Sequence, residues 1–393
     1  MTSTGTLSYR RLVNAGCLLL FCGLCSQGWA WQTEGSEGSE MKKETVQDWP
    51  RFRLTNDNQS VLGTTEIKEP KEVWRFDTGG IIESSPAVVG NKVFIGGHCM
   101  FMHGIDRETG ELLWKFETEG WVRASPSVVD GVVYFGSDDN KFYALNAESG
   151  EKLWDFPLGE GGEQSTPTID DGVVYFGAFD NFVYALDAKT GEQKWKFDAQ
   201  ASMLSSPALS DKALFIATYR GKMFAVSRQD GTKLWEFHEN DTPIFSSPSL
   251  VDGMLYFTSY DHHVYAVDAE SGDIQWKYKT GNQCFSSAAV KDGILYVGSN
   301  DGHLYALSAD KGQLKWKTDL KSAVFASPAI TEGSIYVGGS DGYLYCLEKD
   351  SGEQRWRFYV GEDVNVWSSV AAVNGHLYFG SHEGSLIAVG EKE

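Results

Sequence analysis

The densest cluster of potential metal ligands in the chain spans residues 98–103. Five soft or borderline donors occupy these six residues, namely His98, Cys99, Met100, Met102 and His103. Thiol, thioether and imidazole groups together suit Cu(I), and the tip of a hairpin can fold several of them onto one ion. Alternatively, Met102 and His103 fill positions inside a strand and Cys99 is a buried turn residue. The sequence favours this second interpretation and leaves copper binding by His98, Cys99, Met100 and His103 as a hypothesis.

Carboxylates are the second source of chemistry, because acid–base catalysis and calcium binding both require them. Several acids occupy one equivalent turn position in successive sequence repeats: Asp139, Asp180, Asp261, Asp301 and Asp341. Formation of the turn explains an acid at that position without any catalytic role. The chain has no nucleophile elbow, phosphate-binding loop or zinc-ligand spacing. We therefore expect no catalytic residues.

The elements that position these residues follow from two ladders of eight. Tryptophans recur at spacings of 40 or 41 residues: Trp74, Trp114, Trp154, Trp195, Trp235, Trp276, Trp316 and Trp356. A block related to Ser-Ser-Pro, such as residues 84–86 and 246–248, also recurs eight times. Eight identical tryptophan positions favour structural docking in a core over exposed ligand platforms.

Each unit contains four short predicted strands, as at residues 126–129, 132–136, 141–146 and 152–156, separated by turn residues. Apolar runs such as 132–135 do not alternate with polar residues, so both faces of each sheet must be buried. Sheets packed around an axis meet this demand, and we predict an all-β fold, an eight-bladed β-propeller of four-stranded blades. The last unit ends after three strands, and an orphan strand at 72–78 is predicted to complete blade eight.

The residue before each Ser-Ser-Pro block varies most among the repeats, and it opens the first strand of its blade. We therefore expect these eight residues to surround one mouth of the central channel. Polar residues precede apolar or aromatic ones in the series: Glu83, Arg123, Gln164, Leu204, Phe245, Phe285, Phe325 and Trp367. An aromatic arc bordered by polar groups is typical of a protein-binding surface. Alternatively, the aromatic rings turn sideways between blades and only plug the channel.

The N-terminal region predicts export. Residues 1–30 combine Arg10 and Arg11, an apolar stretch at 18–24 and a small-x-small site at 28–30, which together indicate a Sec-type signal peptide. Residues 31–71 form a polar extension, or tether, in which 48–53 is a segment expected to dock on the propeller of residues 72–393. No other stretch is long and apolar enough to span a membrane. The pattern around Cys17 departs from a lipoprotein site, so lipidation is not favoured.

Charge and cysteine content narrow the classes of partner. The formal net charge is −20 without a basic run, which disfavours nucleic acid and anionic lipid. Outside the predicted signal peptide the cysteines are Cys99, Cys284 and Cys346, an odd and scattered trio that forms no disulfide framework. We expect a monomeric propeller in the periplasm or outside the cell.

Residues 145–154 and 186–195 resemble the tryptophan-docking motif of pyrroloquinoline quinone (PQQ) repeats, with a glycine four residues before the tryptophan. The resemblance spans residues 72–391. Such repeats build quinoprotein dehydrogenases, which use PQQ and calcium, and non-catalytic propellers similar to the outer-membrane assembly factor BamB. The even repeats, without long insertions or a vicinal cysteine pair, resemble the BamB group. This resemblance implies a scaffold without cofactor that binds an envelope or secreted protein. A PQQ- and calcium-dependent dehydrogenase and a carbohydrate or cell-wall binder are the alternatives.

Overall fold

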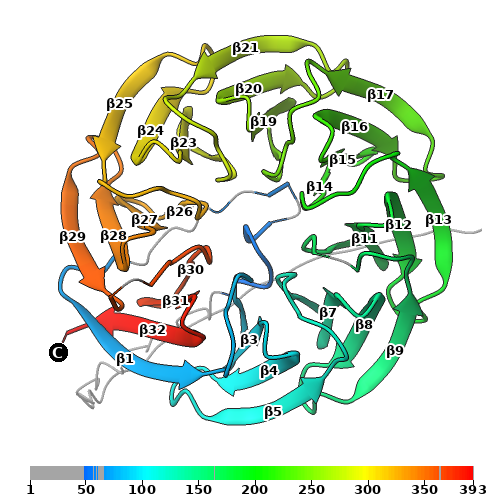
Figure 1. The fold of residues 1–393 in the computed structure, drawn as a ribbon, viewed down its shortest axis with the longest axis horizontal. Helices are drawn as coiled ribbons and strands as arrows, with labels where there is room; N and C mark the ends of the chain where they lie inside the picture. The colour runs from blue at the N-terminus through cyan, green and yellow to red at the C-terminus, as the bar shows by residue number, and fades with distance from the viewer. Residues whose placement is uncertain are drawn as a thin grey trace, which may run out of the picture. The chain divides into compact units, whose positions relative to one another are not determined.

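A computed structural model describes residues 48–392, apart from residues 56, 59, 61–65, 163 and 363. The predicted signal peptide, residues 1–30, and residues 31–47 of the extension lie outside the described residues. The described part of the chain folds into eight four-stranded antiparallel sheets arranged in a ring, which confirms the predicted eight-bladed β-propeller (Figure 1). It contains no helix that could span a membrane. The three cysteines within it are free.

In the first seven blades the strands run outward from the central channel in chain order, and in blade eight the N-terminal strand is outermost. The innermost strands are β2 (Ala87–Val89), β6 (Ser127–Val129), β10 (Thr168–Asp170), β14 (Ala208–Leu209), β18 (Ser249–Val251), β22 (Ala289–Lys291), β26 (Ala329–Ile330) and β30 (Ala371–Val373). The second strands are β3 (Lys92–Gly96), β7 (Val132–Ser137), β11 (Val173–Gly177), β15 (Ala213–Ala217), β19 (Met254–Thr258), β23 (Ile294–Gly298), β27 (Ser334–Gly338) and β31 (His376–Gly380).

The third and fourth strands complete the blades. The third strands are β4 (Phe101–Asp106), β8 (Lys141–Asn146), β12 (Phe182–Asp187), β16 (Lys222–Ser227), β20 (His263–Asp268), β24 (His303–Ser308), β28 (Tyr343–Glu348) and β32 (Ser385–Glu391). The outermost strands are β5 (Leu112–Glu117), β9 (Lys152–Pro157), β13 (Gln193–Asp198), β17 (Lys233–His238), β21 (Ile274–Lys279), β25 (Leu314–Asp319), β29 (Gln354–Tyr359) and, in blade eight, β1 (Pro70–Asp77).

Blade eight joins the two ends of the described chain. β1 pairs antiparallel with β32, from Pro70 opposite Glu391 to Asp77 opposite Ser385. The sheet order is β1, β32, β31, β30, so the N-terminal strand supplies the fourth strand that the last repeat lacks. This pairing confirms the predicted closure, and it leaves no blade with only three strands.

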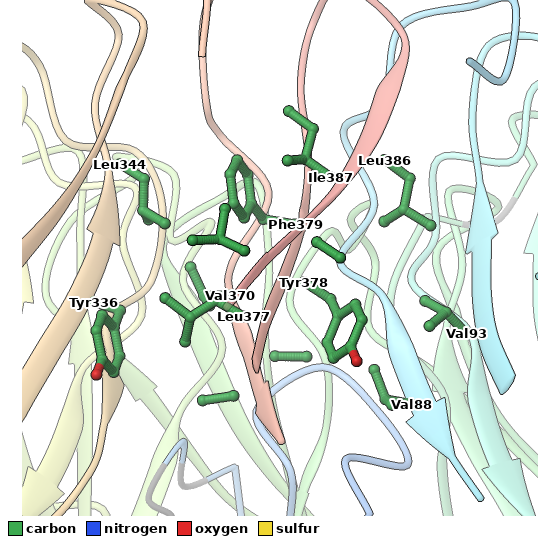
Figure 2. Close-up of a cluster of buried hydrophobic side chains, with 14 of the residues drawn as sticks. Val88, Val93, Tyr336, Leu344, Val370, Leu377, Tyr378, Phe379, Leu386 and Ile387 are labelled. Atoms are coloured by element: carbon green, nitrogen blue, oxygen red, sulfur yellow. The ribbon is translucent and has the colours of Figure 1, made fainter. Parts of the chain in front are cut away.

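The core lies between neighbouring blades, because both faces of each sheet are covered. Figure 2 shows Leu377 and Phe379 of β31 directed toward blade seven, whereas Tyr378 is directed toward blade one. Consecutive residues of one strand thus pack against opposite neighbours. The second and third strands are consequently buried along nearly their whole length, which explains why their apolar runs do not alternate with polar residues.

The eight tryptophans dock each blade onto the next. Trp114 of blade one packs on Gly150 of blade two, and its indole N–H donates to the Ala147 carbonyl at 3.1 Å. Within its own blade the ring lies 5.8 Å from that of Phe94. Six tryptophans donate in this way to the loop between the third and fourth strands of the next blade, and the indole N–H of Trp356 donates to the Ile67 carbonyl, just before β1.

The end of the N-terminal extension enters the central channel, where Figure 1 shows it in blue. Trp49 is 2% exposed and forms an isolated antiparallel bridge with β2, so the predicted docking of residues 48–53 is observed. The segment offers hydrogen bonds to inner strand edges that would otherwise face the channel unpaired. The backbone pairs, with N–O distances of 2.6–2.9 Å, are Trp49 with Val88, Pro50 with Val128, Asp57 with Leu250 and Ser60 with Ile330.

Two arginines anchor this segment, although the sequence did not predict that they would be buried. Arg53 is 1% exposed and donates from Nη2 to Ser249 Oγ at 2.8 Å and from Nε to the Asn58 carbonyl at 2.6 Å. Arg51 Nη2 donates to Asn58 Oδ1 at 3.0 Å. Burial lowers the pKa of both arginines, because the charged form loses water. We refer to residues 48–60 as the channel plug.

Candidate binding site at one mouth of the channel

The eight variable residues occupy equivalent positions at the start of each blade. Wherever the structure describes the residue before one of them, that residue is buried against the preceding blade; Val122, for example, lies against Gly96. The Ser or Ala that follows each of them is also buried. Backbone alternation therefore directs the variable side chain between these two toward the channel. All eight are half-buried, and all eight line one cavity: Glu83, Arg123, Gln164, Leu204, Phe245, Phe285, Phe325 and Trp367.

A belt of hydroxyl groups holds these positions in register. In seven of the eight blocks the second residue is a serine whose Oγ accepts a hydrogen bond from the backbone N–H of the equivalent residue in the preceding blade. Seven such bonds of 2.7–3.0 Å connect the inner strands, including the bond from Ser369 N to Ser85 Oγ that closes the ring. The first Ser bonds within its own blade, as Ser246 Oγ does to the Thr258 carbonyl at 2.9 Å. The repeated Ser-Ser pair thus fixes the backbone beneath the variable side chains.

The cavity has a volume of about 320 Å³. Its walls are the eight variable residues and Tyr219, and the hydroxyl belt lies below them. Phe52 of the channel plug also lines it, so the plug contributes to the inner end of the cavity. A space of this size is at the lower end of ligand pockets and admits one or two large side chains.

An aromatic arc forms the wall from blade four to blade eight. Phe245 and Phe285 stack with ring centroids 4.7 Å apart, and Phe325 lies 4.5 Å from Trp367. Tyr219 packs against Phe245 in an edge-to-face contact at 4.7 Å. These rings are neither buried in the blade core nor isolated on the surface, since each covers part of its neighbour and keeps part exposed.

The opposite wall, from blade one to blade three, is polar. Arg123 Nη2 lies 2.7 Å from Asp138 Oδ2. With the side-chain amide of Gln164 oriented so that its oxygen faces Arg123, this oxygen accepts a hydrogen bond from the guanidinium. Glu83 Oε2 lies 3.3 Å from His98 Nε2. Burial raises the pKa of Asp138, although nearby Arg123 partly offsets this effect. The polar wall is therefore a set of paired charges rather than a single basic patch.

His98 and His103, two members of the hypothetical copper cluster, lie in different environments. His98 stacks on Trp121 at 4.3 Å, near the mouth. His103 lies inside β4, 3% exposed, between Phe76 and Phe101, and burial lowers its pKa to about 4.

Met102 and His103 hold in β4 the positions that Phe142 and Tyr143 hold in β8. Cys99 Sγ contacts the Phe101 carbonyl at 3.9 Å, and Met100 is 42% exposed. Among the described residues, no three His, Cys, Asp or Glu side chains form a group that could hold a metal ion.

The repeated turn acids bond to their own blades. Asp139 Oδ2 accepts from the Tyr143 hydroxyl at 2.7 Å, and Asp180 accepts from Tyr184 at the same distance. Equivalent bonds join Asp261 to Tyr265, Asp301 to Tyr305 and Asp341 to Tyr345. Burial raises the pKa of all five tyrosines, and their carboxylate partners raise it further. The sequence identified the turn but not this tyrosine partner.

The residues around the cavity do not fit PQQ with calcium. A calcium ion needs several oxygen ligands, usually including carboxylates. Among the described residues that line the cavity, Glu83 alone carries a carboxylate, and Arg123, the one cationic side chain available to the acidic quinone, is paired with Asp138. The aromatic arc, Phe52 and the hydroxyl belt also line the cavity, and none of them carries a carboxylate.

The fold and its repeats define the class of protein: an eight-bladed β-propeller of PQQ-type repeats. A family model described as outer membrane protein assembly factor BamB matches residues 58–178, 140–238, 180–289 and 282–392. The chain belongs to this family. A comparison with curated protein sequences finds no match.

Solved structures with this fold include proteins of different kinds. BamB from Moraxella catarrhalis is 18% identical, with a TM-score of 0.72 over 82% of this chain and 99% of that chain. A europium-containing methanol dehydrogenase is 14% identical, with a TM-score of 0.76 over 85% and 90%. The computationally designed Ika8 protein is 16% identical, with a TM-score of 0.70 over 84% and 99%. At these identities the likeness shows the fold and does not decide the function.

Proposed function

We propose that this protein is a non-catalytic scaffold that binds another protein at the cavity mouth. The observation that supports this proposal is the composition of the wall. Inner-strand packing alone favours similar residues in eight equivalent positions, as it does for the docking tryptophans. Instead, an arc of half-exposed aromatic side chains faces a polar wall around one cavity. Aromatic residues bordered by polar groups bury large areas at low entropic cost when a partner binds.

The proposed location is the periplasm or the outside of the cell. This rests on the predicted signal peptide and on membership of a family described as an outer membrane assembly factor. The proposed partner is accordingly an envelope or secreted protein, and the proposed scaffold is a monomer without a cofactor. Copper binding by His98, Cys99, Met100 and His103 stays a hypothesis, and it is not part of the proposed function, because His103 is enclosed by aromatic rings and Met100 lies at the surface.

A triple substitution in the aromatic arc distinguishes partner binding from a purely structural role, in which the rings only fill the mouth of the channel. Phe245→Ser, Phe325→Ser and Trp367→Ser together are expected to leave the melting temperature nearly unchanged and to abolish retention of the partner in a pull-down from envelope extract. The matched control replaces the exposed outer residues Leu153, Leu234 and Leu314 with serine. If the arc only plugs the channel, the triple variant loses several kcal/mol of stability. A variant that melts normally yet keeps every partner would contradict the proposal.

Enzymatic activity is tested on the same preparation. PQQ and calcium are added to the purified protein, and quinone absorbance and alcohol-dependent dye reduction are recorded. We expect neither retention of the quinone after gel filtration nor turnover above a heat-treated control. Reproducible turnover would replace the scaffold proposal with a quinoprotein dehydrogenase.

A further inference from the structure

The aromatic arc presents packed rings rather than open platforms. Phe245 and Phe285 stack at an angle of 16°, so each covers a face of the other, and Tyr219 and Tyr260 approach Phe245 edge-on. Phe325 and Trp367 cover one another at an angle of 30°. Sugars bind to aromatic side chains by lying flat on an open ring face. Packed rings instead favour an apolar or aromatic side chain that makes edge and offset contacts with them.

Charge at the mouth favours a basic ligand. Among the described residues, the one ion pair of Glu83 is with His98, which carries charge only when protonated. Arg123 is matched by Asp138, so among the described residues Glu83 is the carboxylate of this wall that has no Lys or Arg partner. A lysine or arginine beside Glu83 would supply the missing counter-charge within the partly enclosed cavity.

The loops around the mouth also carry more negative than positive charge. Among the described residues, the segments that join each fourth strand to the next blade contain six Asp or Glu and two Lys or Arg. The turns between second and third strands contain seven Asp or Glu and one Arg. The two sets meet, since Glu119 N donates to Asp139 Oδ2 at 3.1 Å and Gly281 N donates to Asp301 Oδ2 at 2.8 Å. A basic partner would therefore be attracted before it makes contact.

From these observations we propose that the mouth binds a basic loop of a partner protein, which inserts one apolar or aromatic side chain against the arc and places a Lys or Arg beside Glu83. The cavity volume of about 320 Å³ admits a side chain and its neighbour but not a folded element. This inference rests on the proposed function and specifies the chemistry of the partner.

The inference is tested by selecting ligands from a random seven-residue peptide library displayed on phage, with the purified full chain as bait. We expect the selected peptides to contain Trp, Phe, Tyr or Leu next to Lys or Arg. A synthetic peptide of the selected sequence should bind Phe325→Ser and Glu83→Gln at least about tenfold more weakly than the wild type. Its affinity should also fall with added salt. Leu234→Ser, on the outer rim, is the control and should bind normally.

Other outcomes would overturn the inference in distinguishable ways. Selected peptides that are acidic, or that bind Glu83→Gln as well as the wild type, contradict the charge assignment. Peptides that bind Phe325→Ser as well as the wild type contradict the assignment of the cavity. The same holds if the library yields no binder. It also holds if an oligosaccharide displaces the peptide. If one of these results accompanies a pull-down that still depends on the arc, the scaffold proposal stands and only the basic-loop inference fails.

Discussion

Single residues in this propeller show how a regular repeat tolerates local exceptions. In five blades a tyrosine of the third strand donates to the turn acid of its own blade, as Tyr143 does to Asp139. Blade one has His103 at the tyrosine position and Cys99 in the turn, whereas blade four has Phe224. His103 is buried between aromatic rings, and no side chain of the described residues bonds to its Nδ1. It is thus accommodated as a neutral ring.

This environment makes His103 a source of acid sensitivity. Burial lowers its folded-state pKa to about 4, below the ordinary value of about 6.5, so only the unfolded state takes up the proton between these values. Stability is therefore fully present above about pH 6.5 and is lost toward pH 4, by about 1.4 kcal/mol per pH unit. In the variant His103→Phe the free energy of unfolding, measured by urea from pH 7 to pH 4.5, should therefore decline less steeply than in the wild type.

The control for this experiment is His238→Gln, because His238 lies exposed at the end of β17. The free energy of unfolding of this control variant should fall with decreasing pH as that of the wild type does. Identical slopes for His103→Phe and the wild type would show that the imidazole is not held neutral in the fold.

At the scale of the element, the structural unit is a blade together with the tryptophan contact, or dock, that joins it to the next blade. Trp114 lies against Gly150, where the chain has a φ of +72° and leaves no room for a side chain. The glycine four residues before the next tryptophan is therefore required for two reasons: the turn needs a positive φ, and the indole leaves no room for a Cβ. Gly131 has a φ of +76°, but a Cβ there would meet nothing within 4 Å.

These two glycines allow the dock to be measured. Gly131→Ala should cost about 1 kcal/mol, because alanine is strained at positive φ. Gly150→Ala should cost about 2–3 kcal/mol more, because its Cβ would lie 2.6 Å from Trp114 ring atoms and force the blades apart. Chemical unfolding monitored by tryptophan fluorescence gives both values. Equal losses for the two variants would mean that the dock contributes nothing beyond the turn.

Particular residues show what the sequence could and could not predict about these elements. The tryptophan and Ser-Ser-Pro ladders predicted the blades, the closure by β1 and the grouping of the eight variable residues, because a repeat gives equivalent residues equivalent places. The burial of Arg53 was not predictable, because it depends on contacts with Ser249 and Asn58 that no local pattern signals. The hydroxyl belt was visible as repeated serines, yet six of its bonds connect residues 40–42 positions apart and the seventh connects the two ends of the ring.

The whole molecule depends on its N-terminal region twice, through β1 and through the channel plug. β1 pairs with β32, and Trp74 docks blade eight onto Gly110 of blade one. The plug bonds to inner strands of blades one, two, five and seven. The ring is therefore closed at its edge by one segment and braced at its centre by another.

Three deletions separate these contributions. Removing residues 31–47 should leave the melting temperature nearly unchanged, since that sequence has few apolar residues. Removing residues 31–60 should lower it, because the inner edges lose the plug. Removing residues 31–80 should lower it most, with a loss of several kcal/mol, each worth about 2 °C in a large domain. Calorimetry measures all three. If the longest deletion melts like the full chain, β1 does not hold the ring closed.

The pairing of β1 with β32 also sets the order of events during synthesis. The first strand of the ring to leave the ribosome is bonded to the last one, so the ring cannot close before almost the whole chain has been made. Contacts between residues more than three hundred positions apart form slowly, because a long loop must first be closed. Until then β1 has no partner strand and the plug has no finished channel to enter, so the ring assembles around a segment that was made before any of its walls.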